Sequence, residues 1–304
     1  MDPSAPVDDV GSGVLLNLFV PQTSDPTIYG YVTASADLSA FAGQTVRLRF
    51  AEVDNQLFNL FGIDNVRLSS GAIGLVADNA TNSVVAFDPK TDTVLTSIPI
   101  PANCGVMGPV AISPDGTKGY VGNFCGQIYV IDLTQTPPVM DAGTNPISVS
   151  VAGEDLSITP DGRYLVASNF GLSVVDLQTR TEIGTNPIQV ESVAVCSDNS
   201  VLTGDSAFNN GVHRFTIDGS GVLTDTGENL GGISADNVTC APGSLTGLAP
   251  DFDSTAVHSF GITGLGAIDV DSITSGGQTS IVNAAGNKAY VRSSDCSNPH
   301  VSIN

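Results

Sequence analysis

The chain has 304 residues, 41% of them hydrophobic, which is enough to bury a core and excludes a disordered protein. Acidic residues outnumber basic ones 31 to 10, and the formal net charge of −21 would repel nucleic acid and anionic membranes. The sequence has no apolar run long enough to span a bilayer, and its acidic start, MDPSAPVDD, is unlike a signal peptide. We therefore expect no nucleic-acid partner and no membrane insertion, and export would depend on a leader that precedes this chain.

The first part of the chain, residues 1–70, carries four predicted strands: GVLLNLFV, TIYGYVTASA, QTVRLRFAEV and FGIDNVRLSS. Alternation in the third places Val46, Leu48 and Phe50 on one face and arginines on the other, as in a half-buried antiparallel sheet. The run ADLSAFAGQTVRLRFAEVDNQLFNLFGIDNVRL resembles the closing half of a jelly-roll module of the carbohydrate-binding type. The resemblance implies a partial β-sandwich whose opening strands lie outside this chain, serving in carbohydrate binding or only as a cap. Its open sheet edge predicts self-association or packing against the rest of the chain.

From residue 71 onward the chain repeats one pattern: an alternating apolar strand, a turn best written as Pro-Asp-Gly, and a second strand. Five copies, spaced by 46, 37, 45 and 42 residues, begin at Pro109, Asp155, Ser192, Asn237 and Thr279. Third strands follow, as in QIYVIDL, LSVVDL, VHRFTID and VHSFGI, and then a more variable fourth strand. Four short antiparallel strands in roughly 40 to 45 residues is the period of a β-propeller blade. The sequence therefore predicts an all-β fold, with a propeller of about six visible four-stranded blades in residues 71–304.

The motifs SPDGTKGYVGN…IYVIDL and TPDGRYLVASN…LSVVDL resemble the YVTN family of β-propeller repeats, which occurs in exported and surface-layer proteins. The resemblance covers residues 71–304 and implies a secreted, periplasmic or cell-surface location. A partial copy, GLVADNATNSVVAFDPKTDTVLTSI, begins at its second strand, and the last copy ends at PHVSIN, before a fourth strand. We therefore expect an unusual ring closure or a ring that is incomplete in this chain.

The candidate site lies at the residues that immediately precede each innermost strand. In successive copies these residues are Gly108, Glu154, Glu191, Asp236 and Gln278. Three carboxylates in adjacent blades would line one side of the channel mouth, where they would raise one another's pKa or bind a cation such as calcium. The predicted ligand contacts are the polar residues that follow them, together with the asparagines that end two second strands: Asp155, Ser192, Asn237, Asn123 and Asn169. The alternative is an ordinary solvated propeller entrance.

Three histidines, His213, His258 and His300, fall near the starts of third strands in successive copies. A metal site would need their rings to converge on one ion, but third strands lie far from the axis of a propeller. We therefore interpret these histidines as surface or hydrogen-bonded residues.

The five cysteines form no CxxC pair and no cluster with zinc-ligand spacing. Cys104 precedes the innermost strand of one blade and Cys125 opens its third strand, so both belong to one face and form the predicted disulfide. Cys196 and Cys240 lie on neighbouring innermost strands but one position out of phase, which predicts that they do not pair. Cys296 resembles Cys125 in position and has no partner like Cys104.

Two functions stay open at this point. The favoured one is a non-enzymatic, exported or cell-surface binding protein that uses the propeller as a rigid platform for an extracellular protein or a carbohydrate. The alternative is a propeller hydrolase or lyase acting on a sugar or lactone, with Glu154, Glu191 and Asp236 as acid, base or metal ligands. The sequence contains no GxSxG, HExxH or phosphate-binding loop that would name a reaction.

Overall fold

A computed structural model describes residues 73–101, 108–205, 211–272, 277–282, 288–293 and 301–303. The chain divides into two compact units, Met1–Arg67 and Leu68–Asn304. The jelly-roll module predicted for residues 1–70, with its carbohydrate binding and its sheet edge, lies outside the described residues and stays a prediction. Among the described residues, helix is limited to one short 3-10 turn, η2 (Thr263–Leu265). The prediction of an all-β protein is therefore confirmed for this part of the chain.

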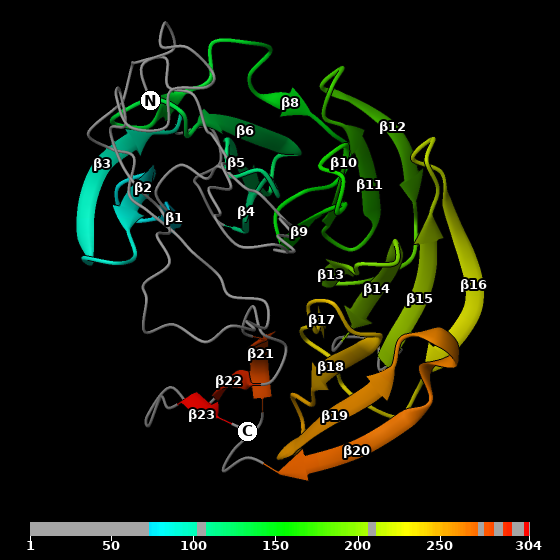
Figure 1. The fold of residues 1–304 in the computed structure, drawn as a ribbon. Coiled ribbons are helices and arrows are strands. Elements are labelled where there is room, and N and C mark those ends of the chain that lie inside the picture. The colour runs from blue at the N-terminus through cyan, green and yellow to red at the C-terminus, as the bar shows by residue number, and fades with distance from the viewer. Residues whose placement is uncertain are drawn as a thin grey trace, which may run out of the picture. The chain divides into compact units, whose positions relative to one another are not determined.

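The described part of the second unit consists of six antiparallel sheets, each formed by strands that follow one another in the chain (Figure 1). Sheet 1 contains β1 (Gly74–Asp78), β2 (Ser83–Asp88) and β3 (Thr93–Pro99). Sheet 2 contains β4 (Val110–Ile112), β5 (Lys118–Asn123), β6 (Gln127–Asp132), β7 (Val139–Met140) and β8 (Ile147–Ser148). Sheet 3 contains β9 (Asp155–Ile158), β10 (Tyr164–Ser168), β11 (Leu172–Asp176) and β12 (Thr181–Asn186).

The remaining three sheets continue the same pattern. Sheet 4 contains β13 (Ser192–Val195), β14 (Ser200–Asp205), β15 (Gly211–Ile217) and β16 (Leu223–Leu230). Sheet 5 contains β17 (Thr239–Cys240), β18 (Thr246–Pro250), β19 (Ala256–Gly261) and β20 (Ala267–Ser272). Sheet 6 contains β21 (Gly277–Val282), β22 (Ala289–Ser293) and β23 (Val301–Ile303). Sheets 3, 4 and 5 have the four strands that the repeat predicts, whereas sheet 2 has five because β7 and β8 both pair with β6. Sheets 1 and 6 each have three described strands.

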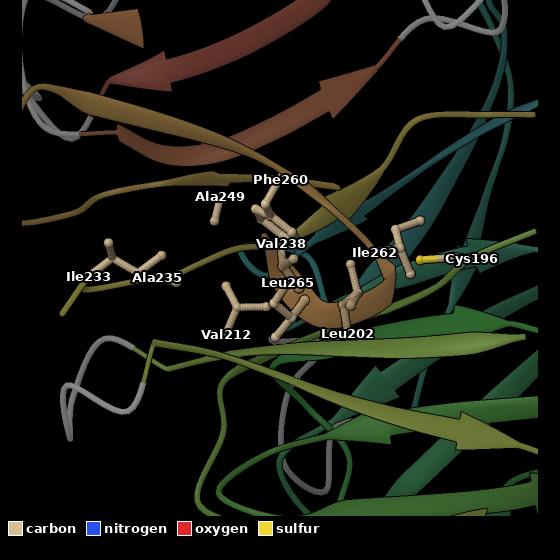
Figure 2. Packing of buried hydrophobic residues seen from close by; sticks show 10 residues of the cluster. All are labelled: Cys196, Leu202, Val212, Ile233, Ala235, Val238, Ala249, Phe260, Ile262 and Leu265. Atoms are coloured by element: carbon tan, nitrogen blue, oxygen red, sulfur yellow. The ribbon is translucent and has the colours of Figure 1, made fainter. Parts of the chain in front are cut away.

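Neighbouring sheets pack face to face, and their innermost strands contact one another in the order β4, β9, β13, β17 and β21. The second and third strands are buried because they have a sheet on either side: in sheet 3, all residues of β10 and β11 are buried, whereas β12 alternates between exposed and half-buried residues. Figure 2 shows the apolar cluster between sheets 4 and 5, which includes the Phe260 ring and the aliphatic side chains of Leu202 and Val212. Stacked antiparallel sheets of three to five strands, three of them four-stranded, make a β-propeller-like fold.

The Pro-Asp-Gly motif forms the predicted turn between the first two strands. In sheet 2, the amide of Gly116 donates to the carbonyl of Ser113 at 2.8 Å, and the Asp115 carboxylate accepts from the Ser113 hydroxyl at 2.6 Å. Sheet 3 repeats both contacts between Thr159, Asp161 and Gly162. Gly116 and Gly162 adopt φ values of 70° and 74°, which glycine accepts without steric cost. The motif therefore serves to close hairpins at the end of the sheets opposite the candidate site.

An ion-pair cluster joins sheets 2 and 3 at that same end. Asp141 lies 2.7 Å from Lys118 Nζ and 2.7 Å from Nη1 of Arg180, which belongs to sheet 3. The Arg180 guanidinium holds the pKa of the Asp141 carboxyl well below its usual range. A carboxyl with a lowered pKa in the folded state stabilises the protein above its ordinary pKa, and this stabilisation is lost as the pH falls.

We expect Asp141→Asn to lower the free energy of unfolding by about 1–2 kcal/mol at neutral pH, because two cations lose their shared partner. The loss should shrink as the pH falls below about 4, because the unfolded wild-type chain then binds a proton at Asp141 while the folded protein keeps this carboxyl ionised. Urea unfolding at several pH values measures both effects, with the exposed Asp253→Asn as control. An equal loss at every pH would mean that the charge of Asp141 is not responsible.

Candidate functional site

The three predicted carboxylates lie in the loops that enter three neighbouring sheets. Glu154 immediately precedes β9 and Glu191 immediately precedes β13, and their amides donate to the carbonyls of Ser168 and Gly204 at 3.1 and 2.9 Å. Asp236 lies farther from its strand, because β17 begins only at Thr239. We call Glu154, Glu191 and Asp236 the acidic triplet.

The acidic triplet is electrostatically connected. Glu154 is exposed, whereas Glu191 and Asp236 are half-buried. Partial burial of the Glu154 carboxyl raises its pKa, and the negative charges of Glu191 and Asp236 raise it further. Glu191 and Asp236 are therefore close enough to Glu154 for their negative charges to disfavour its ionised form.

The polar residues that follow the triplet hold the sheets together. Asp155 accepts hydrogen bonds from its neighbour, the Leu156 amide, at 2.8 Å, and from the amide of Val193 in sheet 4 at 3.0 Å. At the equivalent position in sheet 5, Asn237 Oδ1 accepts from the amide of Ser280 in sheet 6 at 2.9 Å. Burial raises the pKa of Asp155 to about 7, despite these two donors. Asp155 and Asn237 therefore bind backbone amides of the next sheet, a role that the sequence analysis did not foresee.

Ser192, the third residue of this series, is buried, with 3% of its surface exposed. Its hydroxyl has no hydrogen-bond partner among the described residues. A Cβ atom added to Gly204 on the paired strand would lie 2.6 Å from the Ser192 hydroxyl oxygen. Because the backbone of β14 covers this side chain so closely, Ser192 is placed in the core of the sheet and not at an open surface.

The two predicted asparagines shape the turns between second and third strands. Asn123 is buried, and its Oδ1 accepts from the amides of Cys125 and Gln127 at 3.1 and 3.0 Å. Asn169 Nδ2 donates to the carbonyl of Ala152 at 3.4 Å. Short polar side chains that bind the backbone two residues on are characteristic of tight turns. The same turn in sheet 5 uses Asp251, whose Oδ1 accepts from the Asp253 amide at 3.1 Å.

Each of these three turn residues is followed by a phenylalanine. This repeated phenylalanine was not among the residues predicted from the sequence. Phe124, Phe170 and Phe252 have 40%, 46% and 40% of their surface exposed. The signal was present in the segments GNFCG, SNFGL and PDFDS, which align once the repeat is recognised. We call these three side chains the phenylalanine rim.

The histidines do not form a metal site in the described part of the chain. His213 Nε2 lies 2.6 Å from Asn229 Nδ2, and His258 Nε2 lies 4.0 Å from the carboxylate of Asp251. His300 lies outside the described residues. Among the residues that are described, no three or more His, Cys, Asp or Glu side chains are arranged to hold a metal ion. Metal binding by the acidic triplet, with calcium as the proposed ion, therefore stays a prediction that the geometry does not support.

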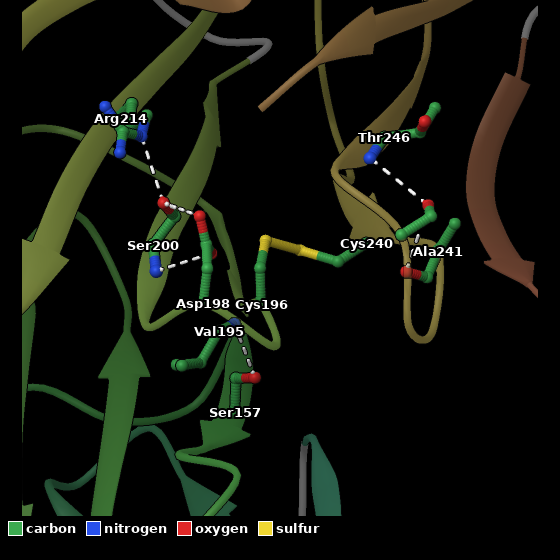
Figure 3. Close-up of a disulfide and its surroundings, with 10 residues drawn as sticks. Ser157, Val195, Cys196, Asp198, Ser200, Arg214, Cys240, Ala241 and Thr246 are labelled. Atoms are coloured by element: carbon green, nitrogen blue, oxygen red, sulfur yellow. Dashed lines mark hydrogen bonds between the residues drawn. A yellow bond between two sulfur atoms is a disulfide. The ribbon is translucent and has the colours of Figure 1, made fainter. Parts of the chain in front are cut away.

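The prediction that Cys196 and Cys240 do not pair is wrong. They form a disulfide whose Cα atoms are 5.5 Å apart and which joins residues 44 positions apart in the chain (Figure 3). The phase difference itself is real: the amides of Cys196 and Ala241 make the equivalent turn hydrogen bonds in their sheets. It does not prevent pairing, because β17 is only two residues long and ends at Cys240, so the two strands are not matched position for position.

The other predicted disulfide involves a residue that the structure does not describe. Cys125 is disulfide-bonded. Cys104, its predicted partner, and Cys296 lie outside the described residues, so the identity of the pair stays a prediction.

No family model matches the chain, and no curated protein matches its sequence. Solved structures do match in fold. One is a functionally unknown protein from Desulfotomaculum acetoxidans, with a TM-score of 0.62, 22% identity, and 73% of this chain and 72% of that chain covered. Another is Kuenenia stuttgartiensis hydrazine synthase, with a TM-score of 0.60, 17% identity, and 77% and 81% covered. The Myceliophteria thermophila Cps50 (Swd1) β-propeller domain has a TM-score of 0.59, 12% identity, and 75% and 79% covered.

These likenesses define a protein with a β-propeller-like fold, and at such low identity they show the fold alone. The prediction of a β-propeller-like fold is therefore confirmed. The number of blades, the closure of the ring and the specific resemblances to YVTN repeats and to a jelly-roll module stay predictions. In the described part of the chain, no helix has the length and apolar character needed to cross a membrane.

Proposed function

We propose that this protein is a non-enzymatic binding platform, exported or displayed at a cell surface, and that its partner contacts the face carrying the acidic triplet. The observation that carries the proposal is that some polar residues at that face join the sheets, whereas an adjacent carboxylate is exposed to solvent. Asp155 and Asn237 accept hydrogen bonds from neighbouring sheets, whereas Glu154, the residue before Asp155, is exposed. A rigid support that carries an exposed carboxylate suits recognition.

The proposed location rests on the cysteines and on the resemblance to exported repeats. The disulfide between Cys196 and Cys240 would persist in an oxidising compartment, and disulfides are rare in the reducing cytosol. The strongly acidic composition also favours solubility outside the cell. An extracellular protein or a carbohydrate is the corresponding class of partner.

One observation favours the enzymatic alternative, a hydrolase or lyase acting on a sugar or lactone. The raised pKa of Glu154 would help this carboxyl to keep a proton and donate it to a leaving group. A second catalytic group would have to come from Glu191 or Asp236. An enzyme would convert its substrate chemically, whereas a binding platform would release its partner unchanged, and this difference separates the two functions.

Both functions can be tested with the full chain immobilised and exposed to arrays of soluble glycans and peptides. We expect some probes to bind and to be recovered chemically unchanged. Binding should weaken in Glu154→Gln/Glu191→Gln and persist in Asp161→Asn, whose carboxylate lies in a hairpin turn at the opposite end of sheet 3. Equal binding by all variants would contradict the proposed face, and cleavage of a probe that Glu154→Gln abolishes would establish the enzyme instead.

A further inference from the structure

The phenylalanine rim and the acidic triplet lie at the same end of the sheets, because each phenylalanine contacts a loop that carries one of the carboxylates. A Cβ atom added to Gly153, next to Glu154, would lie 3.1 Å from Cγ of Phe124. The Phe170 amide donates to the carbonyl of Val190, next to Glu191, at 3.0 Å. The Phe252 amide donates to the carbonyl of Ser234, in the loop that carries Asp236, at 2.8 Å. Three sheets therefore each place a phenylalanine against a loop that carries a carboxylate.

The backbone at one of these phenylalanines is strained. Phe170 has a φ of 49°, in the left-handed region that bulky side chains rarely adopt. Gly153, which packs against Phe124, has a φ of 139°, a conformation that favours glycine. Packing of a fully buried ring would offset such strain, but these rings remain 40–46% exposed. Strain that persists at an exposed aromatic residue points to a role in recognition.

The charges around the rim indicate what kind of partner would fit. Lys118 and Arg163 lie at the far ends of β5 and β10 from Phe124 and Phe170, where they pair with carboxylates on that opposite side. The near end carries the acidic triplet, and the whole chain has a net charge of −21. A cation placed among these groups would relieve repulsion between carboxylates and would also be attracted to the faces of the rings.

We infer that the phenylalanine rim and the acidic triplet together form a docking surface for a basic segment of another protein, one in which lysine or arginine alternates with apolar side chains. Aromatic rings bind the apolar groups and the cations, while the carboxylates select against acidic partners. This inference rests on the proposed function, since it assumes that the face binds a partner, and it names the chemistry of that partner.

The experiment measures binding of the full chain to three labelled probes by fluorescence anisotropy. The probes are a short peptide of alternating lysine and leucine, the same peptide with glutamate for lysine, and a neutral oligosaccharide. We expect the basic peptide to bind more tightly than either other probe. Its affinity should fall as salt is added, because salt screens exposed charges.

Variants distinguish binding by the phenylalanine rim from non-specific binding to exposed apolar side chains. Phe124→Ala/Phe170→Asn/Phe252→Ala should weaken binding of the basic peptide ~10-fold or more. The variant should remain folded, because the rings are exposed and asparagine suits the left-handed backbone at position 170. The matched control, Val94→Ala/Ile183→Ala/Ile268→Ala, removes apolar side chains that are 45–62% exposed from the outer strands β3, β12 and β20 and should bind as the wild type does.

Three results would overturn the inference. Equal affinity for the basic and acidic peptides would exclude charge selection, and undiminished binding by the rim variant would exclude the phenylalanines. Salt-independent binding of the oligosaccharide alone, lost in the rim variant, would keep the binding platform and replace the basic segment by a carbohydrate. If no probe bound here and the array experiment also found no face-dependent partner, the proposed function itself would fail.

Discussion

Replacing both Cys196 and Cys240 by alanine should lower the free energy of unfolding by about 4 kcal/mol. The disulfide closes a loop of about 44 residues, and preventing that closure restores the conformational freedom of the unfolded chain by this amount. Alanine is the suitable replacement because Cys196 is buried, with 1% of its surface exposed, in the apolar cluster between sheets 4 and 5. Denaturant unfolding under oxidising conditions measures the loss.

Two controls identify the bond responsible. Reductant should destabilise the wild type by more than it destabilises the double alanine variant, and the remaining effect reports on the disulfide of Cys125. Mass spectrometry of an unreduced digest should recover the peptide that links Cys196 to Cys240. Free thiols at both positions, or a loss of stability close to zero, would contradict this pairing.

Asp155→Asn should make the protein more stable at pH 8 by about 4 kcal/mol and leave its stability nearly unchanged at pH 4. Burial raises the pKa of Asp155 from 3.8 to about 7, so the folded state binds this proton more tightly than the unfolded chain does. For a raised carboxyl pKa, the contribution to stability is fully present below about 4 and is lost as the pH rises to about 7, at up to ~1.4 kcal/mol per pH unit. Asparagine avoids this loss and still offers an oxygen to the Val193 amide.

The chain itself offers the matched control for this prediction. Asn237 accepts the corresponding amide of Ser280 in sheet 6, so Asn237→Asp should create the pH dependence that Asp155→Asn removes. Urea unfolding of the two variants and the wild type between pH 4 and pH 8 gives the comparison. A stability difference between Asp155→Asn and the wild type that does not change with pH would mean that Asp155 does not titrate in this range.

The repeated hairpins were predictable because their signals are local. The turn residues Ser113 to Gly116 contact one another within four positions, and the buried strands β10 and β11 are mostly apolar, with the sequences YLVAS and LSVVD. Such features depend on neighbours in the chain, so a single sequence reveals them. The shorter strands β7, β8 and β17 were harder to foresee, since their extents depend on how neighbouring sheets pack.

The candidate site was predictable in its position and not in its chemistry. The spacing of the repeat located Glu154, Glu191 and Asp236 at the loops that enter the sheets. The amide that Asp155 binds belongs to Val193, 38 residues away, and the strand repeat does not show that contact. The pairing of Cys196 with Cys240 was missed for the same reason, since the geometry between two sheets decides it.

The residues that join the innermost strands give successive boundaries between sheets different physical properties. The boundary between sheets 3 and 4 contains a titratable carboxyl, that between sheets 4 and 5 a covalent bond, and that between sheets 5 and 6 a neutral amide. In a stack of repeats, stability is largely a sum of such nearest-neighbour terms. Acidity and redox state would therefore act on different boundaries, so each condition would select which pair of blades separates first.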